Sequence, residues 1–85
     1  MNEKEIGYVS KFFGRISVAA IEITALELNV GDTIRIKGHT TDQKMEVISI
    51  QIEHKTVETA KKGDSIGIKV TEKARRKDKV YKIAN

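Results

Sequence analysis

The chain contains no cysteine and no proline, and each absence removes a class of structure or chemistry. Without cysteine, no disulfide can staple the fold, and no thiolate can ligate a metal or attack a substrate. Without proline, the turns have to be made by glycine, aspartate, asparagine or threonine. The chain also has no apolar run near the ~20 residues of a membrane span, and its first residues, MNEKEIG, lack the apolar stretch of a signal peptide. These absences predict a cytoplasmic protein that does not enter the membrane.

Motifs that mark common enzyme classes are missing as well. The chain has no GxxxxGK[ST] phosphate loop, no GxSxG elbow and no HExxH zinc motif. His39, His54 and Asp42 are residues of metal-ligating type, but a metal site needs three or four converging ligands and nothing in the sequence draws these together. The sequence therefore predicts a non-enzymatic protein with no metal and no cofactor.

The residues that are abundant favour strands. The chain has 12 Ile and 7 Val but only 2 Leu and 2 Met. The β-branched side chains of Ile and Val lose little rotamer freedom on a pleated strand, whereas Leu and Met are more typical of helices. With 85 residues, the chain is long enough for a single domain, which we expect to cover residues 1–85 with its core over about 5–84.

Apolar and polar residues alternate in several short segments, which is the pattern of a strand with one solvated face. Residues 6–13 and 16–23 are predicted strands, joined by a hairpin at residues 14 and 15. A long strand is predicted over 44–53, although its apolar phase slips, as in a bulge or a coiled sheet. The side chains predicted to point inward include Ile34, Ile36, Ile50, Ile66, Ile68 and Val70. About six strands in one domain predict an all-β fold, a small six-stranded antiparallel barrel, closed or nearly closed.

One short phrase recurs in the chain. GDTIRIK begins at Gly31 and GDSIGIK at Gly63, with five of seven positions identical, and KDKVYKI begins at Lys77. Glycine tolerates positive φ, and aspartate bonds to the backbone of its own turn, so each copy predicts a turn before a strand. The residues assigned to these structural turns are Gly31, Asp32, Gly63, Asp64 and Asp78. At Gly31 and Gly63 we expect a positive φ or a site where a Cβ would clash.

Positive charge is concentrated in the C-terminal part of the chain. Residues 55–85 carry ten Lys and Arg against four Asp and Glu, whereas residues 1–54 carry six against eight. Such a basic face either neutralises RNA phosphates or keeps a small Ile-rich domain soluble. The aromatic residues Tyr8, Phe12, Phe13 and Tyr81 either stack on bases or pack in the core. The candidate RNA contacts are Lys73, Arg75, Arg76, Lys77 and Lys79, with Arg35 and Lys37 if the fold brings their strand near.

Three stretches carry a resemblance to a known family: LNVGDTIRIKGHTTDQKMEVISIQIEH, VETAKKGDSIGIKV and RRKDKVYKI. They resemble the second, β-barrel domain of translational GTPases such as elongation factor Tu, and the whole chain is similar to small stand-alone translation-factor-like proteins. A related barrel occurs at the C-terminus of some collagenase-like peptidases. The chain departs from the pattern at Lys77 and at residues 25 and 26, where the family often has glycine, and it contains no GTPase domain.

The resemblance implies a translation-factor-like β-barrel module rather than an enzyme. On this hypothesis the protein binds tRNA or rRNA weakly through its basic C-terminal face, and the binding falls with salt. The alternative is a protein-interaction adaptor that docks on a separately encoded GTPase, peptidase or ribosomal partner. The sequence favours a monomer in either case.

Overall fold

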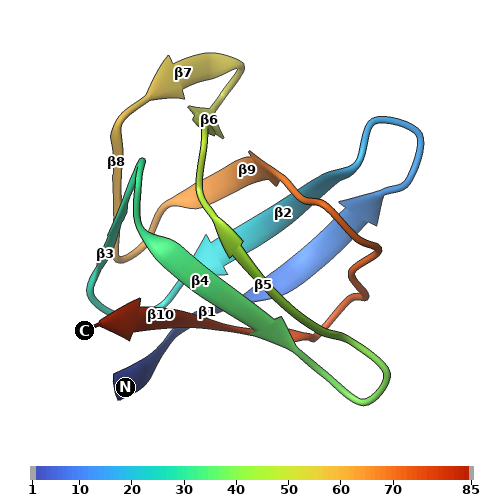
Figure 1. The fold of residues 1–85 in the computed structure, drawn as a ribbon. Coiled ribbons are helices and arrows are strands. Elements are labelled where there is room, and N and C mark those ends of the chain that lie inside the picture. Colours follow the sequence, from blue (N-terminus) through green and yellow to red (C-terminus); the bar gives the residue numbers. More distant parts are fainter. Residues whose placement is uncertain (1, 85) are drawn as a thin grey trace.

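The computed structural model describes residues 2–84, which form an all-β domain of two antiparallel sheets (Figure 1). The larger sheet contains, in spatial order, β5 (Asp42–Glu46), β4 (Thr33–Lys37), β10 (Lys79–Ala84), β1 (Asn2–Phe13), β2 (Val18–Ile23), β9 (Ser65–Lys69), β6 (Ile50–Ile52) and β7 (Lys55–Val57). The smaller sheet pairs β3 (Glu27–Asn29) with β8 (Thr59–Lys61). None of the described segments is a helix of the length and apolar character that crossing a membrane requires.

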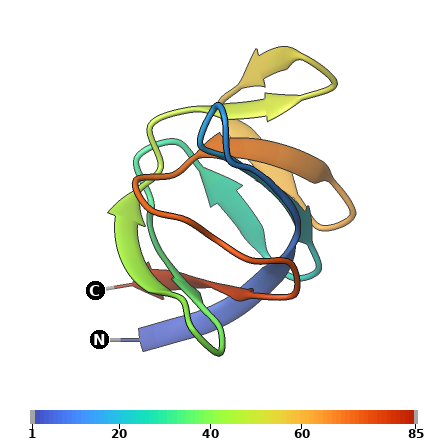
Figure 2. The ribbon, with the colours of Figure 1, turned by 90° about the vertical axis from the view of Figure 1, so that its right-hand side faces the viewer.

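The long strand β1 bends the larger sheet around the core. It pairs with β10 along one side and with β2 along the other, and each ladder shifts register once, between Glu5 and Gly7 and between Val9 and Lys11. Such irregularities increase the local twist of a strand. As a result the sheet curls strongly, so that β4 and β5 lie across the core from β2 and β9 (Figure 2).

The larger sheet stays open, so the prediction of a six-stranded closed or nearly closed barrel is wrong in both strand number and closure. Over residues 2–84 the sheet has eight strands, and no ladder joins its two edge strands, β5 and β7. The chain forms antiparallel strands as predicted, but these divide into two sheets.

The opening arises where the predicted strand over 44–53 breaks in two. β5 ends at residue 46, β6 begins at residue 50, and the three residues between them leave the strand conformation. Val47 still pairs back towards β4: its N–H donates to the carbonyl of Asp32, and its carbonyl accepts from the N–H of Gly31, both at 2.8 Å. The slip in apolar phase therefore marks a change of direction that sends β5 and β6 to different parts of the sheet.

The first hairpin also differs from its prediction. The loop between β1 and β2 contains four residues, 14–17, rather than two, and Ser17 takes a φ of 54°. Ile16, which the alternation placed in the second strand, lies in this loop and is 57% exposed. From residue 18 onward the apolar side chains of this strand alternate regularly, and Ala19, Ile21 and Ile23 are buried.

The core lies between the curled faces of the sheet and is built almost entirely from branched aliphatic side chains. Each fully buried side chain of this kind contributes about 1.5–3 kcal/mol to folding. All of the side chains predicted to point inward are at most 5% exposed, so that prediction is confirmed: Ile34, Ile36, Ile50, Ile66, Ile68 and Val70.

The recurring phrase of the sequence corresponds to three turns of the same geometry, at residues 29–32, 61–64 and 75–78. In each turn the N–H of the final aspartate donates to the carbonyl of the first residue, at 2.9 to 3.1 Å. The carboxylate of the same aspartate accepts from the N–H of the first residue at 2.8 Å. The third residue is left-handed, and the predicted positive φ is observed at Gly31 (98°) and Gly63 (96°).

In the third turn the left-handed position is held by Lys77, with a φ of 77°. A residue with a Cβ pays about 1–2 kcal/mol for this conformation. Glycine relieves that strain but returns about 0.5–1 kcal/mol to the entropy of the unfolded chain. We therefore expect Lys77→Gly to raise the free energy of unfolding by about 0.5–1 kcal/mol. Urea denaturation followed by circular dichroism measures the change.

The reverse substitution, Gly63→Lys, serves as the matched control for this prediction. It places the same side chain in an equivalent turn and should destabilise the protein by a similar amount. A Lys77→Gly variant that unfolds at lower urea than the natural protein would show that the lysine side chain stabilises its turn by more than the strain it causes.

Candidate interaction surfaces

The predicted basic face is a loop between β9 and β10, on the right in Figure 1. Lys73, Arg75, Arg76 and Lys77 lie in this loop, Lys79 begins β10, and all five are exposed. The ammonium group of Lys79 also lies 3.5 Å from the carboxylate of Glu5. The structure therefore brings these residues together on one side of the molecule, with their charges directed to solvent.

Buried polar side chains hold this loop in place from beneath. The side-chain amide of Gln43, which is 4% exposed, donates to the carbonyls of Glu72 and Lys73 at 3.0 and 3.2 Å. Its side-chain oxygen accepts from the N–H of Glu72 at 3.3 Å. Asp78, 5% exposed, closes the last turn as described above. Sequence reasoning missed Gln43, because a glutamine in an alternating strand gives no sign that it will be buried.

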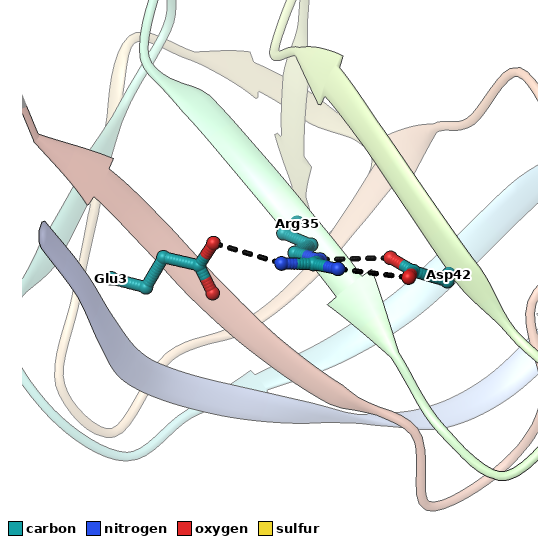
Figure 3. Close-up of polar contacts among 3 residues, drawn as sticks. All are labelled: Glu3, Arg35 and Asp42. Carbon is teal, nitrogen blue, oxygen red and sulfur yellow. Dashed lines mark hydrogen bonds and ion pairs between the residues drawn. The ribbon is translucent and has the colours of Figure 1, made fainter. Parts of the chain in front are cut away.

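Arg35 was predicted to extend the basic face, but its guanidinium is occupied by two carboxylates (Figure 3). It binds Asp42 through two parallel hydrogen bonds of 2.8 Å and binds Glu3 at 3.0 Å. The bonds from Arg35 hold the pKa of the Asp42 carboxyl below its usual value, and the same bonds raise the pKa of Arg35. This geometry links β5, β4 and the first residues of β1, so Arg35 serves the fold.

Lys37 behaves differently from Arg35. It is exposed at the end of β4, directly opposite Lys79 of β10 in the ladder. Two like charges at such a position repel each other slightly. Of the two residues predicted as additions to the basic face, Lys37 lies beside it, whereas the guanidinium of Arg35 is bound to Asp42 and Glu3.

The histidines and two of the aromatic residues lie at the surface. His39 and His54 are exposed, and within residues 2–84 no three His, Asp or Glu side chains come close enough to hold a metal. Tyr8 and Phe13 are 43% and 40% exposed, so the core interpretation is wrong for both. Phe12 packs against the core while partly exposed.

A second surface feature is a groove that the sequence did not predict. Its volume is about 590 Å³. Six of the described residues line it: Lys4, Leu26, Glu27, Lys61, Lys62 and Lys82. These residues come from the start of β1, the segment before β3, β3 itself, β8 with its following turn, and the end of β10. In Figure 1 these elements meet on the left, away from the basic loop. We call this concavity the lysine groove.

The four lysines of the lysine groove differ in whether their ammonium groups have a polar partner. The ammonium group of Lys82 lies 3.2 Å from the carboxylate of Asp32 and donates to the carbonyl of Glu27 at 3.1 Å. For Lys4, Lys61 and Lys62, no carboxylate of the described chain lies within ion-pair distance of the ammonium group. The groove is therefore positive and open to an anion.

A smaller hollow of about 240 Å³ lies between the loop of the first hairpin and β6. Ile16 and Ile68 lie on its wall. Ile48 precedes the lining residue Ser49 in the sequence and is 67% exposed. Exposed aliphatic side chains of this size are common singly on protein surfaces, so this hollow carries less information than the lysine groove.

Comparison with known proteins relates the chain to peptidases. No model of a known protein family matches it. An uncharacterized protease of Methanocaldococcus jannaschii is 49% identical over 78 residues, which are 91% of this chain and 19% of that protein. A collagenase of Porphyromonas gingivalis is 46% identical over 80 residues, which are 91% of this chain and 22% of that protein. The chain thus spans about a fifth of the length of these curated relatives.

The fold is also similar to a solved structure, the crystal structure of the C-terminal domain of a Geobacillus thermoleovorans putative U32 peptidase. The two superpose with a TM-score of 0.88 at 14% identity, over 95% of this chain and 93% of that chain. A selenomethionine variant of the same domain gives a TM-score of 0.82 at 13% identity, over 94% and 99% of the two chains. At this level of identity the likeness shows a shared fold alone.

These comparisons overturn the resemblance to translation factors and the function drawn from it. The relatives that share nearly half of their aligned residues with the chain are named as a protease and a collagenase, and the solved fold is a domain of a putative peptidase. The prediction of a translation-factor-like module that binds tRNA or rRNA is therefore wrong. The resemblance rested on glycine–aspartate turns and alternating strands, which report backbone geometry rather than function. The names of the relatives match the collagenase-like peptidases noted beside that resemblance, although the sheet of the present chain is open and does not form the expected barrel.

Proposed function

We propose that this chain is a non-catalytic accessory domain of a protease of the kind its relatives are named as, and that it acts by binding polypeptide. The observation that carries the proposal is the extent of the similarity. Nearly half of the residues are identical over 91% of this chain, yet the match covers only 19% to 22% of the relatives. A segment of that size has room for a binding domain, while the remaining four fifths of each relative can hold the catalytic machinery.

The described residues offer surfaces that suit a binding role. Catalysis of peptide hydrolysis requires an activated nucleophile or a metal-bound water. The chain has no cysteine, and the buried polar side chains of Thr41, Gln43 and Asp78 leave no buried polar atom without a hydrogen-bond partner over the described residues. What the surface offers instead is a positive groove and a second basic face. The single-domain extent, monomeric state and cytoplasmic location stay predictions from the sequence.

The proposal is tested with the Porphyromonas gingivalis collagenase, produced without the segment that matches this chain. We expect the present chain alone to leave gelatin uncleaved. Added to the truncated collagenase, it should bind, as measured by calorimetry, and should increase gelatin cleavage. An unrelated all-β domain of the same net charge controls for non-specific association. Cleavage by the chain alone, or no association with the truncated collagenase, would overturn the proposal.

A further inference from the structure

We infer that the lysine groove binds an acidic segment of a polypeptide that also presents an aliphatic side chain. The proposal rests on the proposed function in one respect, which is that the ligand is a polypeptide. Everything else about the ligand comes from the groove itself: its volume, its charge and the leucine on its wall.

Two of the lysines are direct neighbours in the sheet, and one of them has no counter-charge among the described residues. Lys82 lies opposite Ile34 in one ladder and opposite Lys4 in the other. Residues directly opposite one another share a face of the sheet, so Lys4 and Lys82 lie in one row with a fully buried isoleucine. The row places two like charges side by side at the end of the concave face. Asp32 compensates one of them, and the other is left without an anion within the described residues.

Leu26 has an unfavourable backbone conformation and an unfavourable exposure of its side chain. Its φ is 61°, a left-handed conformation that is uncommon for a large side chain. Its side chain is 52% exposed, although the sequence has only 2 leucines in all and the other, Leu28, is fully buried. An asparagine or glycine would adopt this conformation with less strain. Strained residues tend to gather at ligand sites, and this one directs an aliphatic side chain into the groove.

The remaining lysines surround that leucine. Lys61 ends β8, and Lys62 follows it in the turn at residues 61–64, where both side chains are exposed. Among the described residues that line the groove, Glu27 is the one with a carboxylate, and it lies opposite Lys61 in the small sheet. Even with Asp32 paired to Lys82, the four ammonium groups and Glu27 leave an excess of positive charge around an aliphatic centre.

An acidic peptide satisfies both parts of this surface at once. Its carboxylates complement the lysines, and one of its aliphatic side chains covers Leu26. The volume of about 590 Å³ is in the range of sites that enclose a few side chains. None of the described residues that line the groove is aromatic, so the groove does not offer, over residues 2–84, the stacking platform with which proteins hold single-stranded nucleic acid. A lipid surface is flat, whereas this site is concave.

The test measures the binding of a fluorescein-labelled peptide, Glu-Leu-Glu-Glu-Leu-Glu, to the present chain by fluorescence anisotropy. We expect a Kd on the order of 10–100 µM at low salt. Because exposed charges are screened, binding should weaken several-fold between about 0.05 and 0.2 M salt. A probe with glutamine in place of every glutamate should bind at least about tenfold more weakly.

Two variants locate the site and share the same change in net charge. Lys61→Glu with Lys62→Glu should raise the Kd of the acidic probe at least about tenfold. Arg75→Glu with Arg76→Glu lies in the basic loop, on the other side of the molecule in Figure 1, and should change the Kd of the acidic probe by less than about twofold because salt screens exposed charges. Both pairs are exposed and make no ion pair over the described residues, so both variants should fold.

Leu26→Asn separates the role of the leucine in binding from any role in folding. Relief of the left-handed strain should raise Tm by about 2–5 °C. The same substitution should raise the Kd of the acidic probe about fivefold, because the aliphatic contact is lost. A variant that is more stable and yet binds less well supports a binding role for Leu26. Unchanged binding by this variant overturns the aliphatic part of the proposal.

Other ligands are tested on the same chain. Equal loss of binding in the groove and loop variants, or equal affinity for the neutral probe, overturns the proposal. Displacement of the acidic probe by tRNA or by phosphatidylserine vesicles at lower concentration than by unlabelled peptide also overturns it. The truncated collagenase keeps the two proposals apart: association without peptide binding removes the groove proposal only, and peptide binding without association removes the accessory-domain proposal only.

Discussion

Gly7→Ala is expected to destabilise the protein by about 3 kcal/mol or more, at the upper end of the losses that overpacking causes. Gly7 lies where β1 pairs with β2 and β10 at once, opposite Ile23 and Val80. A Cβ at this position would overlap the carbonyl oxygen of Glu22 and would lie 3.3 Å from the Cα of Ile23. Both contacts are with backbone, so no change of rotamer relieves them and the β1–β2 ladder has to open. Urea denaturation and Tm measure the loss.

Gly14→Ala is the matched control for that substitution. Gly14 lies in the hairpin loop, where an added Cβ would meet only the ring of Phe12 at 3.7 Å, an ordinary contact. Its stability should change by no more than about 0.5 kcal/mol. If the two alanine variants unfold at the same urea concentration, the close approach of β1 to Glu22 is not a constraint on the fold.

The parts of this fold that were predictable are those fixed by local rules. Ile34 and Ile36 alternate with polar residues, and both are fully buried, because the two-residue period of a strand assigns each side chain to one face. Gly31 and Gly63 precede aspartate, and both take positive φ because few other residues adopt it at low cost. Neither inference needed knowledge of which strands pair.

The parts that failed depend on pairings between distant segments. Whether residues 44–53 form one strand or two is decided by the bonds of Val47 to residues 31 and 32, which the alternation does not encode. That break leaves the sheet open, although the number and type of residues fit a barrel. A slip in apolar phase has several structural solutions, and the choice among them is made by tertiary contacts.

The lysine groove was unpredictable for the same reason. Lys4 and Lys82 are far apart in the sequence and become neighbours only through the β1–β10 ladder. Lys61 joins them through the small sheet that pairs β3 with β8. The sequence instead drew attention to residues 73–82, where the charges are adjacent in the chain. The sequence therefore shows where positive charges are densest along the chain. The lysine groove forms only when the strand pairing brings distant lysines together.

Ile34→Ala is expected to lower the free energy of unfolding by about 2–5 kcal/mol, through the lost burial of three carbons and the cavity they leave. Ile34 is fully buried in β4, between Lys82 of β10 and Met45 of β5, so its neighbours on both sides are fixed in ladders and can collapse only partly. The matched control is Ile48→Ala, since Ile48 is 67% exposed and loses the same atoms from the surface. The control should change stability by about 0.5 kcal/mol or less. For a domain of this size, each kcal/mol shifts Tm by about 4–8 °C, so the two variants should differ by at least about 6 °C in a thermal melt. Similar melting temperatures for the two would mean that the concave face of the sheet is not where the protein derives its stability.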